Sequence, residues 1–318
     1  MASAELTANH SNASDNPVLK AMAVARRRRL AKEKAIEVVL LAAASVSIVT
    51  TLGILYVLIS ETAIFFSEVS FSQFFFDTQW TPLFEDKHFG IWVLLSGTFT
   101  SSMVALSVAI PLGTIIAIYL SEFATPLVRE VIKPVLELLS GVPTIVFGYF
   151  ALLFVTPLLQ QLIPSLPGFN LLSAGIVMGV MIIPYISSIA EDAMRSVPMS
   201  LREGSYAMGA TRLQTAARVV FPAAFSGVAA AYILGISRAV GETMILAVAA
   251  GSQPNLTINP AESAATVTSF IAAVAQGDLP HGSIEYQTIF AAGLSLFVVT
   301  LIFNLAGMYL RRRYRESY

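Results

Sequence analysis

Arg238 and Glu242 are oppositely charged residues that stand four positions apart inside the apolar stretch 223–250. Residues with this spacing share one face of a helix. A charged side chain costs roughly 2.5–3.5 kcal/mol at the centre of a bilayer, so a helix in a membrane must turn both residues away from lipid. Two interpretations follow: a pore-lining pair that breaks and forms as an anion passes, or a structural bridge between helices.

The arginine of this pair is suited to an oxyanion. Its planar guanidinium can donate two parallel hydrogen bonds to phosphate oxygens. An arginine that a neighbouring carboxylate neutralises is nevertheless a poor permanent anion site. We therefore expect Arg238 to guide an anion transiently rather than to hold it tightly.

A second candidate cluster occupies residues 137–148, ELLSGVPTIVFG. Pro143 removes a backbone hydrogen bond and is expected to kink the helix. The kink would let Thr144 or the freed carbonyl groups face a pathway. A packing interface with a structural kink fits the same residues equally well. The residues that allow close helix packing are Ser140, Gly141 and Gly148.

Segment 191–222 carries two sets of helix-capping residues. Ser200 and Glu203 match the S-x-x-E capping box, in which the two side chains satisfy free backbone amides at a helix start. Gly209 follows at the distance where a left-handed residue would end that helix. The pattern therefore predicts a short, well-defined helix beginning at Ser200.

Thr211 and Gln214 repeat the arrangement as T-x-x-Q and predict a second helix, which runs towards Pro222 and the next apolar stretch. Two short capped helices joined at a glycine indicate a rigid element that is presented to a partner. An amphipathic pair lying on a membrane surface fits the same pattern.

The composition indicates that a membrane positions these residues. Only 12% of the 318 residues are charged and 56% are apolar, whereas a soluble domain has about 25% charged residues. The mean hydropathy is +0.73. The sequence has no cysteine, and its histidines are far apart, so we expect neither a disulfide nor a metal site.

A membrane-spanning helix needs roughly 20 mostly apolar residues. Stretches of this kind predict an all-α integral membrane protein with about six transmembrane helices, because none of them alternates as a barrel strand would. The predicted spans are approximately 37–59, 92–120, 134–159, 171–190, 223–250 and 288–310.

The positions of lysine and arginine predict the orientation, because these residues are retained on the cytoplasmic side. They concentrate before the first span, between spans two and three, between spans four and five, and after the last span. With six spans, all these segments lie on one face. The opposite face has Lys87 among many acidic residues. Both termini are therefore predicted to be cytoplasmic.

The domain boundaries follow from these patterns. We expect a basic, mostly disordered segment over 1–36, with disorder over 1–25, a transmembrane domain over 37–310 and a basic tail over 311–318. The first span is expected to be an uncleaved anchor, since no small-residue cleavage site follows it. The basic stretch 25–34 serves as a topology signal or contacts anionic lipid headgroups.

The sequence contains no G-x-x-x-x-G-K-[ST] and no Gly-Lys pair, so it lacks a phosphate-cradling P-loop. If the protein performs ATP-driven transport, hydrolysis must occur on a separate polypeptide. We therefore expect no catalytic residue and no cofactor bound by this chain.

The segment from Glu203 to Pro222 resembles the "EAA" loop of ABC-importer permeases. Glu203-Gly204-Ser205, then Gly209, then Val220-Phe221-Pro222 follow the pattern of that loop, with Gly-Ser in place of Ala-Ala. The resemblance implies the type I, MetI-like permease fold over about 92–310. It also implies that Glu203, Gly204, Ser205 and Gly209 couple the permease to a cytoplasmic ATPase.

The patterns ELLSGVPTIVFG and SRAVGETM resemble the permeases of phosphate ABC importers, of the PstC type, over roughly 90–310. This resemblance implies a bacterial inner-membrane protein with Arg238, Glu242 and Thr144 along the translocation pathway. The implied partners are a PstA-like second permease, two PstB-like ATPase copies that use ATP and magnesium, and a PstS-like extracytoplasmic phosphate-binding protein; no nucleic acid is implied.

Other functions are compatible with parts of the same sequence. A permease for another oxyanion and the PstA-type subunit itself share much of the pattern. A proton-coupled carrier that uses Arg238 and Glu242 as a relay would usually show paired repeats, and no convincing repeat is present. No metal-ligand spacing, nucleophile motif or carboxylate cluster supports a membrane enzyme.

Overall fold

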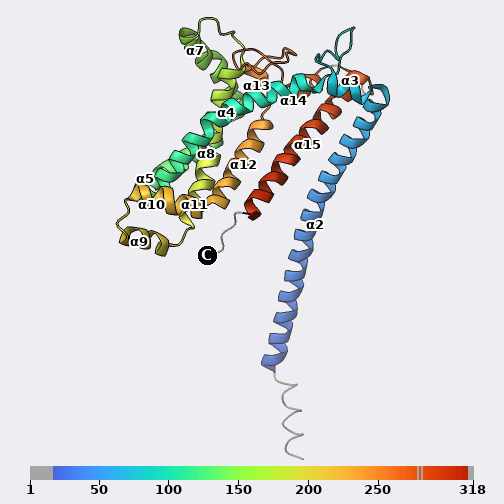
Figure 1. Ribbon diagram of the computed structural model, residues 1–318. Coiled ribbons are helices and arrows are strands. Elements are labelled where there is room, and N and C mark those ends of the chain that lie inside the picture. The colour runs from blue at the N-terminus through green and yellow to red at the C-terminus, as the bar shows by residue number, and fades with distance from the viewer. Residues whose placement is uncertain (1–16, 278, 281, 314–318) are drawn as a thin grey trace, which may run out of the picture. The chain divides into compact units, whose positions relative to one another are not determined.

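The computed structural model describes residues 17–277, 279–280 and 282–313 (Figure 1). Within that part of the chain the β-structure is an isolated bridge between Trp80 and Phe89. The helices, in chain order, are α2 (Pro17–Glu68), α3 (Phe71–Phe76), α4 (Ile91–Ile118), α5 (Pro126–Ser140), α6 (Thr144–Phe150), α7 (Thr156–Leu162), α8 (Leu171–Arg195), α9 (Met199–Ala207), α10 (Arg212–Thr215), α11 (Phe221–Ala223), α12 (Phe225–Val240), α13 (Met244–Ala249), α14 (Val267–Ala275) and α15 (Ile284–Arg313). The π-helical turns are η1 (Tyr119–Phe123), η2 (Ala151–Val155) and η3 (Ala216–Val220).

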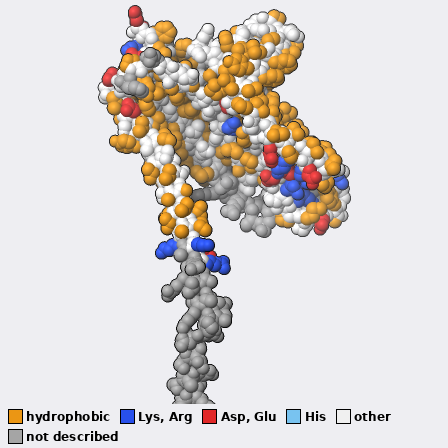
Figure 2. Space-filling view, turned by 180° about the vertical axis from the view of Figure 1, so that it is seen from behind, with side chains coloured by type: hydrophobic (Ala, Val, Ile, Leu, Met, Phe, Trp, Pro, Cys, Tyr) orange, Lys and Arg blue, Asp and Glu red, His pale blue; other side chains and the backbone are white. Residues whose placement is uncertain are grey.

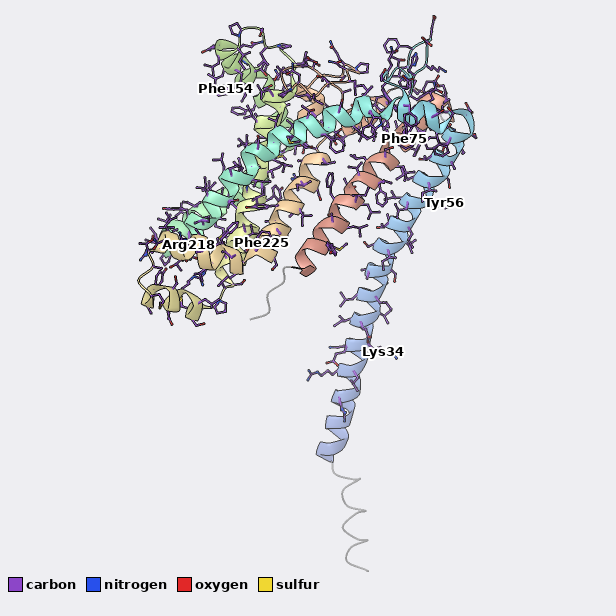
Figure 3. The ribbon with its side chains drawn as sticks, viewed as in Figure 1. Lys34, Tyr56, Phe75, Phe154, Arg218 and Phe225 are labelled. Carbon is purple, nitrogen blue, oxygen red and sulfur yellow. The ribbon has the colours of Figure 1, made fainter. Side chains whose placement is uncertain are left out.

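The chain divides into two compact units, residues 1–57 and 58–318. In the first unit the described residues form the greater part of α2, which starts at Pro17. The predicted disorder over 1–25 lies partly outside the described residues, and residues 17–25 are helical. Their alanine, leucine, methionine and lysine are strong helix formers, and so are the arginines that follow from Arg26. The basic stretch therefore continues the apolar helix without a break. Lys34 and Tyr56 project from this helix and are exposed (Figure 3).

Five of the described helices are long and apolar enough to cross a membrane: Lys32–Glu68, Ile91–Phe123, Thr144–Leu162, Leu171–Arg195 and Ile284–Tyr309. A sixth span is obtained if Arg212–Ala223 and Phe225–Val240, which meet at 76°, are counted together. The prediction of an all-α membrane protein with about six spans is confirmed.

The third span differs from its prediction over 134–159. Residues up to Ser140 belong to α5, and the spanning helix starts at Thr144. Pro143 therefore does not kink a continuous helix but precedes a new one. The physical reason is that a proline has no N–H to donate and disfavours the helical conformation at the residue before it, here Val142.

The fifth span also differs from its prediction over 223–250. Its main helix, α12, ends at Val240, and α13 begins only at Met244. Gly241 stands directly after the end of α12. Glycine disfavours a helix interior by about 1 kcal/mol relative to alanine. The break separates Arg238 from Glu242, which are therefore not on one face of a single helix.

Helix α8 lies at the centre of the second unit, and two thirds of the residues in its most apolar stretch are buried. A Cβ atom on Gly175 would lie 2.7 Å from the side chain of Val104, and one on Gly179 would lie 2.7 Å from the carbonyl of Ala105. These glycines let the backbones of α4 and α8 approach closely, as small residues do between membrane helices.

The second unit has two chemically different ends. Figure 1 shows α3, α7 and α13 at one end and α9, α10 and α11 at the other. An aromatic cluster gathers around α3, with Phe65, Phe74 and Phe89 in edge-to-face contacts. Figure 2 shows lysine, arginine, aspartate and glutamate side chains gathered at the end that carries α9.

Candidate functional site

Arg238 lies in the last turn of α12, inside the apolar part of the second unit. Its guanidinium carbon lies 4.6 Å from the centroid of the Tyr185 ring, a cation–π distance. Its Nε atom is buried and has no hydrogen-bond partner. Buried polar atoms are nearly always satisfied in folded proteins. The Nε–H group of Arg238 is therefore free to donate a hydrogen bond to an acceptor.

Glu242 caps the helix that follows the break. Its Oε1 accepts hydrogen bonds from the backbone amides of Met244 and Ile245 at 3.1 and 3.3 Å. Its own carbonyl accepts a hydrogen bond from Thr268 Oγ1 at 2.6 Å. A carboxylate at this position satisfies free backbone amides, and its negative charge interacts favourably with the positive end of the helix dipole.

The predicted ion pair between Arg238 and Glu242 is not formed among the described residues. The i and i+4 geometry on which it depended requires a continuous helix, and α12 has ended before Glu242. The other interpretation, a bridge between helices made by these two charges, is not observed either. The assignment of both residues to the translocation pathway stays a prediction.

Tyr185 connects this region to the end of α5. Its hydroxyl donates a hydrogen bond to the carbonyl of Ser140 at 3.3 Å. Ser140 is the last residue of α5. The tyrosine ring thus contacts Arg238 while its hydroxyl holds the segment that leads to Pro143. Tyr185 was not among the predicted site residues, although a tyrosine directly after Pro184 within the apolar stretch 171–190 was a usable signal.

Thr144 is the first residue of α6 and is half-buried. Four residues later, a Cβ atom on Gly148 would lie 3.0 Å from Val248 and 3.2 Å from the carbonyl of Met244. The close packing that we predicted for Gly148 is therefore confirmed, and its partner is α13. A place for Thr144 along a pathway stays a prediction.

Helix α9 begins one residue earlier than predicted, at Met199, after Pro198. The capping box of Ser200 and Glu203 is not formed, since no side chain caps this helix. The fixed φ of a proline favours a helix start directly after it. Glu203 and Gly204 are exposed on α9.

Gly209 ends this element with φ of +81°, as predicted. Its amide donates a hydrogen bond to the carbonyl of Tyr206 at 2.9 Å. The second capping box is also confirmed, because Thr211 and Gln214 exchange side chain to backbone hydrogen bonds at 3.3 and 2.9 Å. The turn between α9 and α10 is therefore defined by local contacts, as the sequence indicated.

A hydroxyl contact joins the two short helices. Ser205 Oγ on α9 lies 2.8 Å from Thr215 Oγ1 at the end of α10. From α10 the chain continues through η3 and α11 into α12, with a bend of 76° after Ala223. Arg218 and Phe225, labelled in Figure 3, lie on either side of this bend. The element made of α9, α10, η3 and α11, here the coupling element, is thus continuous with the helix that carries Arg238.

Arg202 anchors the coupling element to the end of α4. Its Nη2 and Nε donate hydrogen bonds to the two oxygens of Glu122 at 2.9 and 3.2 Å. It also donates to the backbone carbonyls of Met194 and Val197 at the end of α8. The side chains of Arg202 and Glu122 are both almost fully buried. One arginine therefore fastens α9 to η1, the π-helical turn that follows α4, and to the end of α8.

Glu191 forms a second buried ionic cluster, between α8 and α5. Its side chain is fully buried, and Lys133 Nζ donates a hydrogen bond to its Oε2 at 2.8 Å and to Asp192 Oδ1 at 2.6 Å. Burial by itself lowers the pKa of Lys133, but the bonds to Asp192 and Glu191 outweigh it and raise the pKa. Arg129 and Arg195 lie at 3.5 and 3.6 Å from Glu191 Oε1.

Neither ionic cluster was predicted from the sequence. The residues that meet are 58 and 80 positions apart, and no local pattern joins them. A weaker signal was available, because Glu122 and Glu191 are carboxylates at the ends of apolar stretches whose adjoining loops are basic.

Comparison with known proteins places this architecture in a class. Residues 109–316 match the family described as "Binding-protein-dependent transport system inner membrane component". The chain is 39% identical over 245 residues to the probable ABC transporter permease protein YqgH of Bacillus subtilis, covering 77% of this chain and 79% of that protein. It is 31% identical over 266 residues to the phosphate transport system permease protein PstC of Xylella fastidiosa, covering 77% and 80%.

Solved structures agree on the fold. An importer of the acidic polysaccharide alginate has a chain with TM-score 0.61 and 19% identity, covering 91% of this chain and 100% of that one. A chain of the MetNI methionine transporter has TM-score 0.51 and 19% identity, covering 71% and 95%. The family match and the fold together define a transport permease of the ABC-importer type.

The chain belongs to the family of binding-protein-dependent transport system inner membrane components. It is a permease subunit, a multi-pass protein of the inner membrane with the MetI-like fold. The resemblance inferred from the coupling element and from the two intramembrane patterns is confirmed.

Proposed function

We propose that this permease subunit imports inorganic phosphate, with both termini on the cytoplasmic side, and that a separate ATPase supplies the energy. The observation that carries the substrate is the similarity over about three quarters of the chain to proteins named as phosphate permeases, including PstC of Mesorhizobium japonicum at 32% identity. Arg238 agrees with an anionic substrate, because its guanidinium contacts a ring rather than a carboxylate.

The proposed orientation assigns the end with α9 to the cytoplasm. Basic residues concentrate in the segments that reach this end, among them Arg129, Lys133, Arg195 and Arg212. The opposite end carries Asp77, Glu85, Asp86 and Glu262. Such asymmetry follows the positive-inside rule. An extracytoplasmic phosphate-binding protein, PstS-like, would then reach the end that carries α3 and α7.

The turn between α9 and α10 offers a surface for the ATPase, of which we expect two PstB-like copies. Met208 and Leu213 flank Gly209 and are 88% and 64% exposed. Flexible methionines and exposed apolar patches are common at protein interfaces. Glu203 and Gly204 lie on the same helix and are also exposed. A PstA-like second permease would complete the transmembrane pathway.

The contacts of the coupling element suggest how ATPase closure moves the permease. A displacement of α9 is transmitted to α4 and α8 through Arg202, and to α10 through Ser205 and Thr215. Displacement of α10 and α11 moves α12, whose last turn carries Arg238. The movement shifts the guanidinium relative to Tyr185 and so alternates its exposure to a passing anion.

Uptake into proteoliposomes tests the proposal. The permease is reconstituted with its second permease, the ATPase and the binding protein, and labelled phosphate is followed with ATP inside. We expect that accumulation of labelled phosphate requires both ATP and the binding protein. We also expect that unlabelled phosphate inhibits this uptake more strongly than sulfate or molybdate does. Uptake driven by a proton gradient alone would contradict the proposal, and preference for another oxyanion would change the substrate.

Substitution of the intramembrane residues tests the pathway. Arg238→Gln is expected to abolish uptake without affecting assembly, because it removes the charge that attracts the anion. Glu242→Gln keeps an oxygen that can cap α13 and is expected to retain most of the uptake. Loss of assembly in Arg238→Gln would indicate a structural rather than a transport role.

A further inference from the structure

A pocket of about 430 Å³ opens between the end of α4, helix α5, the end of α8 and the coupling element. We call it the arginine pocket. Its wall contains the arginines Arg129, Arg195, Arg202 and Arg212 and a single carboxylate, Glu122. Charged side chains gather at this end of the second unit in Figure 2. The wall thus combines four guanidinium groups with one negative charge.

The single carboxylate of the wall already accepts hydrogen bonds from neighbouring residues. Glu122 accepts hydrogen bonds from Arg202 through both oxygens and a further one from Ser121 at 2.6 Å. This bidentate pair neutralises Arg202 and leaves it as part of the scaffold. The charges of the other three arginines must be balanced from elsewhere.

The nearest further carboxylate compensates them only in part. Glu191 lies behind the wall and gives its Oε2 to Lys133 at 2.8 Å. Its Oε1 lies 3.5 Å from Arg129 and 3.6 Å from Arg195 and forms no hydrogen bond to either. One carboxylate is thus shared by three cations. Arg129 uses its Nε and Nη2 on the carbonyls of Leu120 and Ser121, whereas Arg195 keeps free donors.

Arg212 lines the same pocket as Arg195. It is the first residue of α10 and is exposed, and within the described residues no carboxylate lies within ion-pair distance of it. The side chain of Arg195 is half-exposed. Two guanidinium groups with free donors therefore border one pocket from two different helices.

We propose that the arginine pocket binds a phosphate group and that its occupancy holds α10 against the end of α8. Two guanidinium forks match a tetrahedral oxyanion better than single-point donors do. An ion bound between Arg195 and Arg212 resists displacement of the coupling element, so occupancy slows transport. The site is separate from Arg238, and its existence does not depend on which anion the permease carries.

The phosphate group can come from two sources, and α5 makes both accessible. Apolar residues on this helix are exposed at helical spacing, including Leu127, Val131 and Leu138. Arg129 and Lys133 of the same helix point to the ionic cluster of Glu191. A helix with this pattern suits the headgroup layer of a membrane. The ligand is therefore either the phosphate of an anionic lipid or free inorganic phosphate.

The experiment uses the assembled transporter with Arg238→Gln, in nanodiscs and without the binding protein. Hydrogen exchange of residues 199–215 is the readout, since it reports on the coupling element locally. One arm titrates inorganic phosphate into nanodiscs of net-neutral phosphatidylcholine at constant ionic strength. The other arm compares these nanodiscs with nanodiscs that contain phosphatidylglycerol, in the absence of phosphate. Arg195→Gln and Arg212→Gln are the test variants, and Arg218→Gln, exposed on η3 outside the pocket, is the matched control.

Binding is expected to slow exchange, and each test variant is expected to weaken the apparent affinity about tenfold, the effect of losing one charge-assisted contact. Arg218→Gln should behave as the parent. A response in the first arm identifies free phosphate, and a response in the second identifies a lipid headgroup. The proposal is overturned if neither ligand slows exchange, or if the test variants respond as the control does.

Discussion

Arg238 rests on the ring of Tyr185, with 4.6 Å between the guanidinium carbon and the ring centroid. A cation buried against an aromatic face gains up to about 2 kcal/mol, which is less than the cost of leaving it unpaired in hydrocarbon. The ring therefore offsets part of this cost without neutralising the charge. A carboxylate in its place would compete with the transported anion for the same donors. The arrangement suits a residue that must attract an anion and also release it.

Substitutions at Tyr185 separate its ring from its hydroxyl. Tyr185→Phe keeps the cation–π contact and loses the hydrogen bond to Ser140, whereas Tyr185→Leu loses both. We expect uptake near the parent rate for phenylalanine and a severalfold loss for leucine, with assembly unchanged. Proteoliposome uptake measures both variants. An equal loss in the two variants would assign the role to the hydroxyl, and no loss in either would contradict a role for the ring.

Gly209 and Gly204 form a matched pair in the coupling element. Gly209 has φ of +81°, whereas Gly204 lies within α9, and at both positions a Cβ atom would meet nothing within 4 Å. Alanine at Gly209 costs roughly 1–2 kcal/mol in the left-handed region, so Gly209→Ala is expected to distort the turn and to separate ATP hydrolysis from uptake. Gly204→Ala should stabilise α9 slightly, because alanine is the better helix former.

The ratio of phosphate imported to ATP hydrolysed measures the effect. We expect a lower ratio for Gly209→Ala and an unchanged ratio for Gly204→Ala. If both substitutions lowered the ratio, the surface of α9 rather than the shape of the turn would be responsible. Unchanged ratios in both would contradict the assignment of Gly209 to coupling.

Much of the fold could be predicted because it depends on local patterns. The apolar stretches identify the spans, and Thr211 with Gln214 identifies a helix start, since a capping box is formed within four residues. The start of α9 was less accessible. Ser200 and Glu203 offered a capping box, but Pro198 favoured a start one residue earlier. Two local preferences competed there, and the sequence does not reveal which of them prevails.

The site was predictable only in part, because its decisive contacts are not local. Arg238 and Glu242 were found from their charge, but the break after Val240 changed their relationship. At that break, the carbonyl of Glu242 accepts a hydrogen bond from Thr268, which is 26 positions away in the sequence. Tyr185 likewise gains its role from a neighbour on another helix. Charge can thus identify a residue, but it does not identify its partner.

The pair of Glu122 and Arg202 is expected to stabilise the coupling element. Removing one partner of a buried ion pair leaves an uncompensated charge and costs about 3–5 kcal/mol. Glu122→Gln should therefore lower the thermal stability and raise hydrogen exchange in α9. Glu203→Gln is the control, because Glu203 is exposed and its loss should leave stability unchanged. Similar stability in the two variants would show that the buried pair does not anchor α9.

The opposite end of the second unit has a histidine whose charge depends on pH. His88 Nδ1 lies 2.7 Å from Asp77 Oδ2, and its Nε2 lies 3.4 Å from Asp86. The hydrogen bond to Asp77 raises the pKa of His88 above its ordinary value of 6.5, although burial opposes the shift. Burial also acts to raise the pKa of Asp77, but the hydrogen bond from His88 lowers it below 3.8.

The signs of these shifts define a pH window for local stability. Because the pKa of His88 is raised in the folded protein, its contribution is complete below about pH 6.5 and is lost as the pH rises through the folded-state pKa. Because the pKa of Asp77 is lowered, its contribution is present above its ordinary value and is lost as the pH falls through the folded-state pKa. Residues 77–90 should therefore be most stable in weakly acidic solution.

Hydrogen exchange of this segment, corrected for the intrinsic effect of pH, should be slower near pH 6 than near pH 8. His88→Gln should remove the difference and Glu85→Gln, on an exposed residue of the same segment, should keep it. A pH difference that persists in His88→Gln would assign the effect to another group.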